Sequence, residues 1–313
     1  MKLAKGFIIL RIGLAFWVLA SPASFLDACP RCQSSAHQEG GGLPLSRFLA
    51  PQAASASLPV AGRPADSAAL PETSDSSQVV VNIFGRDIPV SLVDSDNHAA
   101  PTVGGYTNGD GARVITGRRL EDAHVYAQAG RGEIRLLGGV ADDGHPEIAQ
   151  AADLYDRAMA EAGASLDETT LANTFIYTTA LHEGLHVSQI ADFERTGAAL
   201  PRSDAELQAY AFEIASSPDN GTSRLVQLSG IANQIHVLLA VDPGQRPDDG
   251  PQMAADYLNA LGRAVQQVAG PEAYTHSQDL APGRTEGLAP LISALAGLDE
   301  NQLRAATRQA YTG

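Results

Sequence analysis

The sequence predicts an α+β fold, in which a small β-sheet precedes a mostly helical C-terminal part. Between residues 78 and 140, short β-rich runs alternate with turn residues. After Gly144 the apolar residues recur at helical spacing almost to the end of the chain. Because strands gather in one half and helices in the other, a wound α/β sheet, in which the two alternate, is not expected.

The first 23 residues have the composition of a secretory signal peptide. Three basic residues precede an apolar run at 12–20, and the small Ser21 and Ala23 fit cleavage after Ala23. The run is short for a membrane span, so an uncleaved anchor is the lesser alternative. No later segment reaches eighteen consecutive apolar residues. We therefore expect an exported protein, periplasmic or secreted, with no membrane span once the leader is removed.

Residues 24–77 are rich in Ala, Ser, Pro and Gly and predict a flexible tether. The tether holds both cysteines of the chain, Cys29 and Cys32, in a CxxC arrangement. No strand pattern precedes them, so a thioredoxin-like site is not favoured over a small disulfide. Lipid anchoring through Cys29 is a further, weaker possibility, and the role of the pair stays open.

Net charge argues against a nucleic-acid partner. The 313 residues carry a formal charge of −15, and loss of the three basic leader residues would bring it to about −18. The basic residues after the leader are scattered arginines that form no run. We expect residues 78–313 to fold as one acidic domain, and the sequence does not indicate its oligomeric state.

The β-rich part predicts two hairpins and one further strand. The first hairpin turns at Gly85-Arg86-Asp87, and the second at Asn108-Gly109-Asp110-Gly111, which is strong turn chemistry. The five strands are expected at residues 79–84, 88–93, 102–107, 112–116 and 133–137.

The helical part contains one segment with clear start and stop signals, at residues 168–196. Ser165-Leu166-Asp167-Glu168 predicts a capping box before it, and Gly197 predicts its C-terminal end. Its one interior glycine, Gly184, costs helix stability and therefore indicates close approach of a neighbouring element. Further helices are expected at residues 146–162, 204–216, 222–241, 252–269 and 299–311.

The helix 168–196 carries the motif His182-Glu183-Gly184-Leu185-His186, an HExxH pattern. Spacing of four places the two imidazoles on one helix face, about one turn apart, where they can share a tetrahedral ion. Glu183 lies one step round the helix, so it suits the role of general base toward a water on the metal. A satisfied histidine pair in a helical core is the alternative.

A catalytic zinc needs a third protein ligand, and two downstream glutamates are candidates. Glu206 lies in the first turn of a short helix that begins near Ser203, but Ser203-Asp204-Ala205-Glu206 also forms a capping-box pattern that would occupy its carboxylate. Glu213 comes level with the histidines if that helix returns antiparallel. Asp192 and Asp204 are weaker choices. The three-histidine pattern HExxHxxGxxH is absent, since Gln189 and Ile190 follow Ser188.

HExxH with Glu206-Leu207-Gln208-Ala209 downstream resembles the gluzincin metallopeptidases, in which an ExxA or ExxxD glutamate completes the site. The resemblance covers roughly residues 100–215 and implies a zincin-like fold. It implies Zn²⁺ held by His182, His186 and Glu206, with Glu183 as base. Tyr210 stands where thermolysin-type members carry an aspartate that supports a histidine, so that support is in question.

The resemblance further implies a peptide or protein substrate and endopeptidase activity outside the cytoplasm. It also implies that the hairpin before the motif supplies an edge strand for the substrate, and an ordinary hairpin without this role is the equal alternative. The alternative function is a non-catalytic, zincin-like binding protein with a structural metal. Weak candidates for stabilising the transition state are His236, Tyr274 and His276. The remaining histidines with acidic neighbours are read as solvated surface: His98, His124 and His145.

Overall fold

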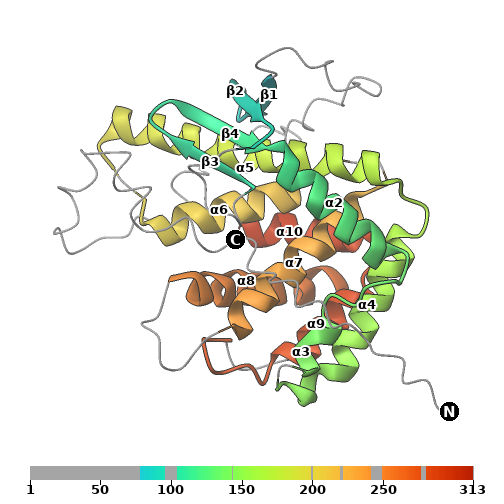
Figure 1. Cartoon of the computed structure of the whole chain (residues 1–313). Coiled ribbons are helices and arrows are strands. Elements are labelled where there is room, and N and C mark those ends of the chain that lie inside the picture. The colour runs from blue at the N-terminus through green and yellow to red at the C-terminus, as the bar shows by residue number, and fades with distance from the viewer. Residues whose placement is uncertain are drawn as a thin grey trace.

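The computed structural model describes residues 78–95, 104–142, 144–198, 200–218, 221–240, 249–275 and 280–312. The expected leader and the tether with its two cysteines lie outside these ranges. A four-stranded sheet is followed by a mostly helical part, so the predicted α+β class is confirmed (Figure 1). None of the helices in the described ranges is both long enough and apolar enough to cross a bilayer.

The sheet has the strand order β1-β2-β4-β3. Strands β1 and β2 form one antiparallel hairpin, β3 and β4 form the other, and β2 pairs with β4 in parallel. Both predicted hairpins are therefore confirmed, and the parallel pairing leaves β3 as a terminal strand of the sheet. The strands are β1 (Gln78–Ile83), β2 (Arg86–Val93), β3 (Gly105–Asn108) and β4 (Gly111–Ile115).

The first hairpin turns one residue earlier than predicted. Arg86 and Asp87 pair with Ile83 and Asn82 in the ladder, so the turn consists of Phe84 and Gly85. Both have positive φ, 50° and 81°, as a two-residue primed turn requires. The prediction extended the turn over the polar residues Arg86 and Asp87. The positive φ angles instead place the turn at Gly85 and the residue before it.

The predicted strand at residues 133–137 is wrong, because this run is a turn that leads into α3 (Gly138–Asp142). Its apolar side chains Leu136 and Leu137 are buried in the helical core. Its backbone donors meet a side chain instead of a strand: the N–H groups of Leu137 and Gly138 donate to the Asp156 carboxylate at 2.9 and 2.8 Å. The β-rich composition therefore reflects burial, not sheet pairing.

The predicted helices are present with ends that shift by a few residues. Three helices were not predicted: α2 (Thr116–Gly130), the short α3 and α9 (Leu288–Gly297). Helix α2 was missed because its buried face combines alanines with the charged Arg119 and Asp122 and so lacks an apolar period. The predicted helices are η3 (Pro146–Ile148) with α4 (Ala149–Gly163), α5 (Glu168–Thr196), α6 (Arg202–Ala215), α7 (Ser223–Leu239), α8 (Asp249–Ala269) and α10 (Glu300–Thr312).

Helix α5 is the element that connects the sheet to the helical part. It contacts all four strands, α2 and α6 (Figure 1). Its N-cap is Asp167, whose side chain accepts from the Thr170 N–H at 2.8 Å, so the predicted cap at Ser165 is wrong by two residues. Its C-terminal stop at Gly197 is confirmed, with φ of 71°. A Cβ added to Gly184 would lie 2.6 Å from Val81 of β1, which accounts for the interior glycine.

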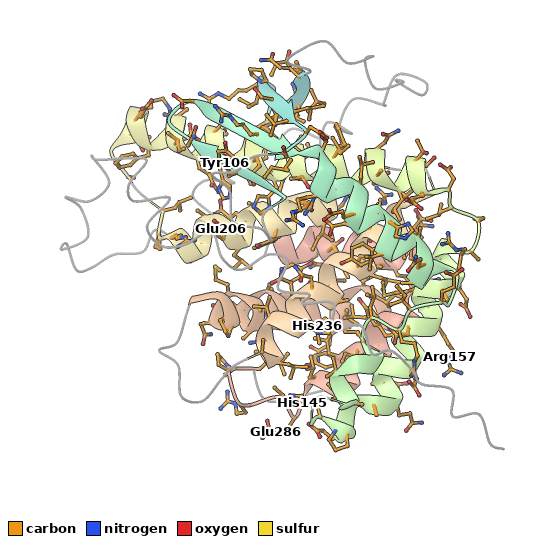
Figure 2. All side chains as sticks on the ribbon, viewed as in Figure 1. Tyr106, His145, Arg157, Glu206, His236 and Glu286 are labelled. Atoms are coloured by element: carbon orange, nitrogen blue, oxygen red, sulfur yellow. The ribbon has the colours of Figure 1, made fainter. Side chains whose placement is uncertain are left out.

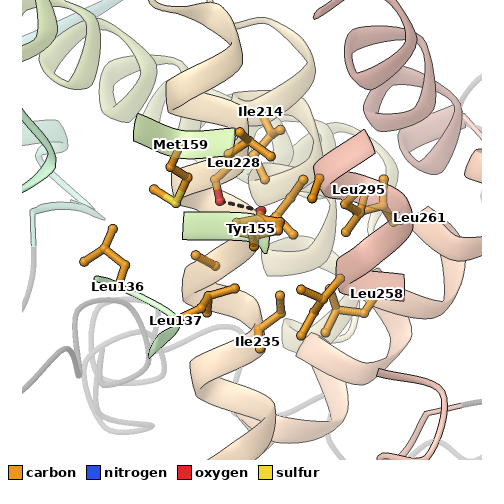
Figure 3. Close-up of a cluster of buried hydrophobic side chains, with 14 of the residues drawn as sticks. Leu136, Leu137, Tyr155, Met159, Ile214, Leu228, Ile235, Leu258, Leu261 and Leu295 are labelled. Carbon is orange, nitrogen blue, oxygen red and sulfur yellow. Dashed lines mark hydrogen bonds between the residues drawn. The ribbon is translucent and has the colours of Figure 1, made fainter. Parts of the chain in front are cut away.

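Two hydrophobic clusters lie on either side of this helix. The smaller packs the sheet against α5 and includes Val81, Val114 and Leu181. The larger fills the space among the helices, and Figure 3 shows it around Tyr155, whose hydroxyl donates to the Leu228 carbonyl at 2.8 Å. Helix α5 therefore packs against the helical core near its N-terminal end and against the sheet along the part that carries the motif.

Candidate metal centre

The two motif histidines lie together on one face of α5. Both are buried, with 3% of His182 and 5% of His186 exposed. Their Nε2 atoms are 3.2 Å apart, and their rings meet edge to face with centroids 4.9 Å apart. The four-residue spacing produces this pairing because residues i and i+4 lie one above the other on a helix.

Glu206 approaches the histidine pair from α6. Its Oε2 lies 3.6 Å from Nε2 of His182 and 3.6 Å from Nε2 of His186. The predicted capping box at Ser203–Glu206 is wrong: α6 already begins at Arg202, has Pro201 as its N-cap and shows no side-chain cap hydrogen bond. The carboxylate is therefore available to the histidines, and Figure 2 shows Glu206 on the side of α6 that faces the strands.

These three residues form a group that could hold a metal ion. A tetrahedral zinc with bonds of about 2.0–2.2 Å separates its ligand atoms by about 3.4 Å. The three ligand atoms here are 3.2, 3.6 and 3.6 Å apart, so an ion fits between them without a large change in geometry. Among the residues that the structure describes, no other cluster of His, Cys, Asp or Glu meets the same criterion.

Glu213 contacts the opposite nitrogen of His182. Its Oε2 lies 3.2 Å from Nδ1 of that imidazole. The carboxylate favours a proton on Nδ1, and this leaves a lone pair on Nε2, the nitrogen that faces Glu206. Glu213, predicted as an alternative ligand, thus approaches the side of His182 that faces away from the Glu206 carboxylate.

His186 is held in the same way by an amide. Its Nδ1 lies 2.8 Å from Oε1 of Gln189, and Nε2 of Gln189 donates to the Ala205 carbonyl and to Gln208, both at 3.2 Å. The amide oxygen accepts from Nδ1, so the Nε2 lone pair of His186 also faces the group. Sequence reasoning missed Gln189, although its place three residues after His186 on one helix could have indicated it.

Electrostatics around the imidazoles favour a cation. Burial acts to lower the pKa of His182, but the neighbouring carboxylates of Glu206 and Glu213 outweigh it and raise the pKa to about 10. Burial likewise opposes the raised pKa of His186, which the Glu206 charge produces. Burial would raise the pKa of Glu206, yet the two imidazoles hold it well below its usual value. A metal ion supplies the same positive charge and displaces protons from the site.

Glu183 lies beside this group and outside it. It is 4% exposed and its carboxylate Oε2 accepts from the Thr107 hydroxyl of β3 at 2.8 Å. Burial raises the pKa of Glu183, while the nearby imidazoles and the Thr107 hydroxyl oppose the increase. A carboxylate with a raised pKa beside a candidate metal is suited to accept and return a proton. Sequence reasoning did not identify Thr107, because only tertiary structure brings β3 to this glutamate.

A small cavity of about 40 Å³ lies on the far side of Tyr210 and Glu213, both of which contact His182. Its wall includes the buried ion pair of Arg119 and Asp122, whose charged atoms are 2.7 Å apart. A cavity of this size has room for a few water molecules, which the polar groups among its lining residues could bind. The Tyr210 ring meets the His182 ring edge to face with centroids 4.8 Å apart, so it lies between the cavity and that imidazole.

The remaining candidate residues are not brought to the metal group. Nε2 of His236 lies 3.0 Å from the Leu136 carbonyl, and Figure 2 shows His236 far from Glu206. Tyr274 is buried against Gly262 of α8. Asp192 pairs with arginines at the surface. His124 and His145 each pair with a nearby glutamate. The predicted positions His98 and His276 lie outside the described residues.

Comparison of the chain with family models, with curated proteins and with solved structures finds no match.

Proposed function

We propose that this chain is a zinc-dependent peptidase of the zincin type, similar in its ligand pattern to the gluzincins. One observation carries the proposal: His182, His186 and Glu206 converge at 3.2–3.6 Å, while Glu183 lies next to them without joining them. Three protein ligands leave the fourth position of a tetrahedral ion for water, as catalytic sites require. A purely structural site would be closed by a fourth side chain.

Two imidazoles and one carboxylate are a ligand set that suits zinc. Softer ions prefer thiolate ligands, and Mg²⁺ or Ca²⁺ prefer sites made wholly of oxygen. The contacts of Glu213 and Gln189 with the outer nitrogens support the assignment, because histidine ligands of zinc commonly donate their second N–H to a carboxylate or carbonyl.

Glu183 performs the proton transfers in this proposal. Zinc, when bound, supplies Lewis acidity that polarises the scissile carbonyl and lowers the pKa of the attacking water. Glu183 takes one proton from that water as its oxygen bonds to the carbonyl carbon. Glu183 then returns the proton to the amide nitrogen as the carbon–nitrogen bond breaks, so a carboxylic acid and an amine leave and the carboxylate is restored.

Strand β3 is the proposed docking edge for an extended peptide. Its pairing with β4 places the hydrogen-bonded pairs at Tyr106 and Asn108, as the bond from Ile115 N–H to the Gly104 carbonyl indicates. The N–H and C=O groups of Gly105 and Thr107 therefore point to the open side of the strand. A substrate that adds there by β-augmentation lies directly beside Glu183. Action outside the cytoplasm remains part of this proposal and depends on the leader.

The test replaces Glu183 by glutamine and compares it with Glu194→Gln, an exposed glutamate on the same helix. We expect Glu183→Gln to retain zinc and to lose peptide hydrolysis by roughly 10³-fold or more, because the proton acceptor is removed while the ligands stay. Glu194→Gln should match the wild type. Hydrolysis of a peptide library by the zinc-loaded full chain, with metal content measured in parallel, provides the readout.

Retained activity in Glu183→Gln would contradict the mechanism. A wild-type chain that binds zinc and cleaves no peptide in the library would instead support the alternative of a non-catalytic zincin-like binding protein.

A further inference from the structure

We infer that strand β3 positions the general base, with the Thr107 hydroxyl holding the Glu183 carboxylate and Gly105 providing the space beside it. Thr107 is thus a positioning residue for catalysis. This inference rests on the proposed function for its kinetic consequence, whereas the structural part of it is independent of activity.

The first observation is the pair of contacts that the Thr107 hydroxyl makes. Its Oγ1 lies 2.8 Å from Oε2 of Glu183 and 3.0 Å from the main-chain carbonyl of the same residue. Both acceptors belong to Glu183 and share the single hydroxyl proton, so one hydroxyl links the side chain to its own backbone. With Oε2 held in this way, Oε1 is the carboxylate oxygen that is left to exchange a proton.

The second observation is the absence of a side chain at Gly105. Residues 105 and 107 are two apart on a strand, so they share the face of β3 that meets α5. A Cβ added to Gly105 would lie 3.0 Å from Cγ of Glu183 and 2.8 Å from Cγ2 of Thr179. Any larger residue would press on the glutamate and on the helix, so glycine allows the close approach that the Thr107 contact requires.

Strand β3 also combines two roles in this proposal. The outward backbone groups of Gly105 and Thr107 are those proposed to bind the peptide, and the side chain of Thr107 holds the base. Any shift of β3 therefore moves substrate and base together. Such coupling keeps the reacting groups in register, where a misplacement of about 1 Å costs about 10²-fold in rate.

The experiment compares Thr107→Val, which removes the hydroxyl at nearly constant shape, with Thr107→Ser, which restores it. Thr116→Val is the matched control, because Thr116 is also part-buried and donates to a backbone carbonyl, but that carbonyl belongs to Val93 of β2 and not to Glu183. We expect Thr107→Val to lower kcat by roughly 10- to 100-fold while KM changes by only about threefold. Zinc content and melting temperature should equal those of Thr116→Val, and Thr107→Ser should recover most of the rate.

Crystal structures of wild type, Thr107→Val and Thr107→Ser supply a readout that does not need activity. The inference predicts that the Glu183 carboxylate leaves β3 in the valine variant and stays in the serine variant. It is overturned by an unmoved carboxylate in Thr107→Val, or by a kcat within about twofold of wild type. If the wild type cleaves no peptide, the proposed function fails, while the position of Glu183 in the crystals still decides whether Thr107 holds it.

Discussion

At the scale of single residues, the site depends on which nitrogen of each imidazole faces which partner. The sequence could predict His182, Glu183 and His186, because helical spacing alone places them. It left Glu206 and Glu213 as alternatives, since both are on one short helix and both come near the histidines. The structure separates them by side: Glu206 approaches Nε2 and Glu213 approaches Nδ1 of His182. This distinction depends on side-chain packing that no sequence spacing reveals.

The separate tasks of the two glutamates give a prediction for Glu213→Gln. The variant should still bind one zinc at saturation but with about 10- to 100-fold lower affinity, because a partner that orients a ligand histidine is weakened while the ligands remain. Competition against a chromophoric chelator measures the affinity, and Glu206→Gln on the same helix is the comparison. Equal affinities for Glu213→Gln and wild type would show that the Nδ1 contact has no role in binding.

At the scale of elements, local sequence signals predicted the turns and helix ends well. Contacts between segments distant in the sequence could not be predicted in this way. Turn residues and apolar periods located both hairpins and the ends of α5 to within a few residues. The parallel pairing of β2 with β4 makes β3 the terminal strand. These two strands are not consecutive in the sequence, so their pairing has no local sequence signature. Helix α2 was missed because its buried face holds an ion pair, and residues 133–137 were misassigned because their donors meet Asp156.

The contact between α5 and β1 gives a prediction for Gly184→Ala. In an isolated helix alanine would add about 1 kcal/mol of stability. Here the new Cβ would lie 2.6 Å from Val81, so we expect the free energy of unfolding to fall by about 1–3 kcal/mol. Urea denaturation followed by circular dichroism measures it. Adding Val81→Ala makes room for the methyl group, so the double variant should lose less than the sum of the two single losses. Additive losses would argue against this contact.

At the scale of the whole molecule, the site lies where three elements meet, and the rest of the chain holds them. The sheet supports α5 from one side, and α7, α8 and α10 contact α6. Arginines of α10 donate to carbonyls at the C-terminal end of α6, at Ala215 and Ser217. The long C-terminal helical region therefore acts as the support for the helix that carries Glu206. The sequence predicted most of the helices in this region, but it could not show that they support α6.

The most direct test of the account is the zinc content of the purified full chain, measured by elemental analysis after dialysis against low zinc, for wild type and Glu206→Ala. We predict about one zinc per chain in the wild type. In the variant the affinity for zinc should fall by at least roughly 100-fold, because two imidazoles alone cannot complete the site. A wild type without zinc, or a Glu206→Ala variant that binds zinc as tightly as the wild type, would contradict it.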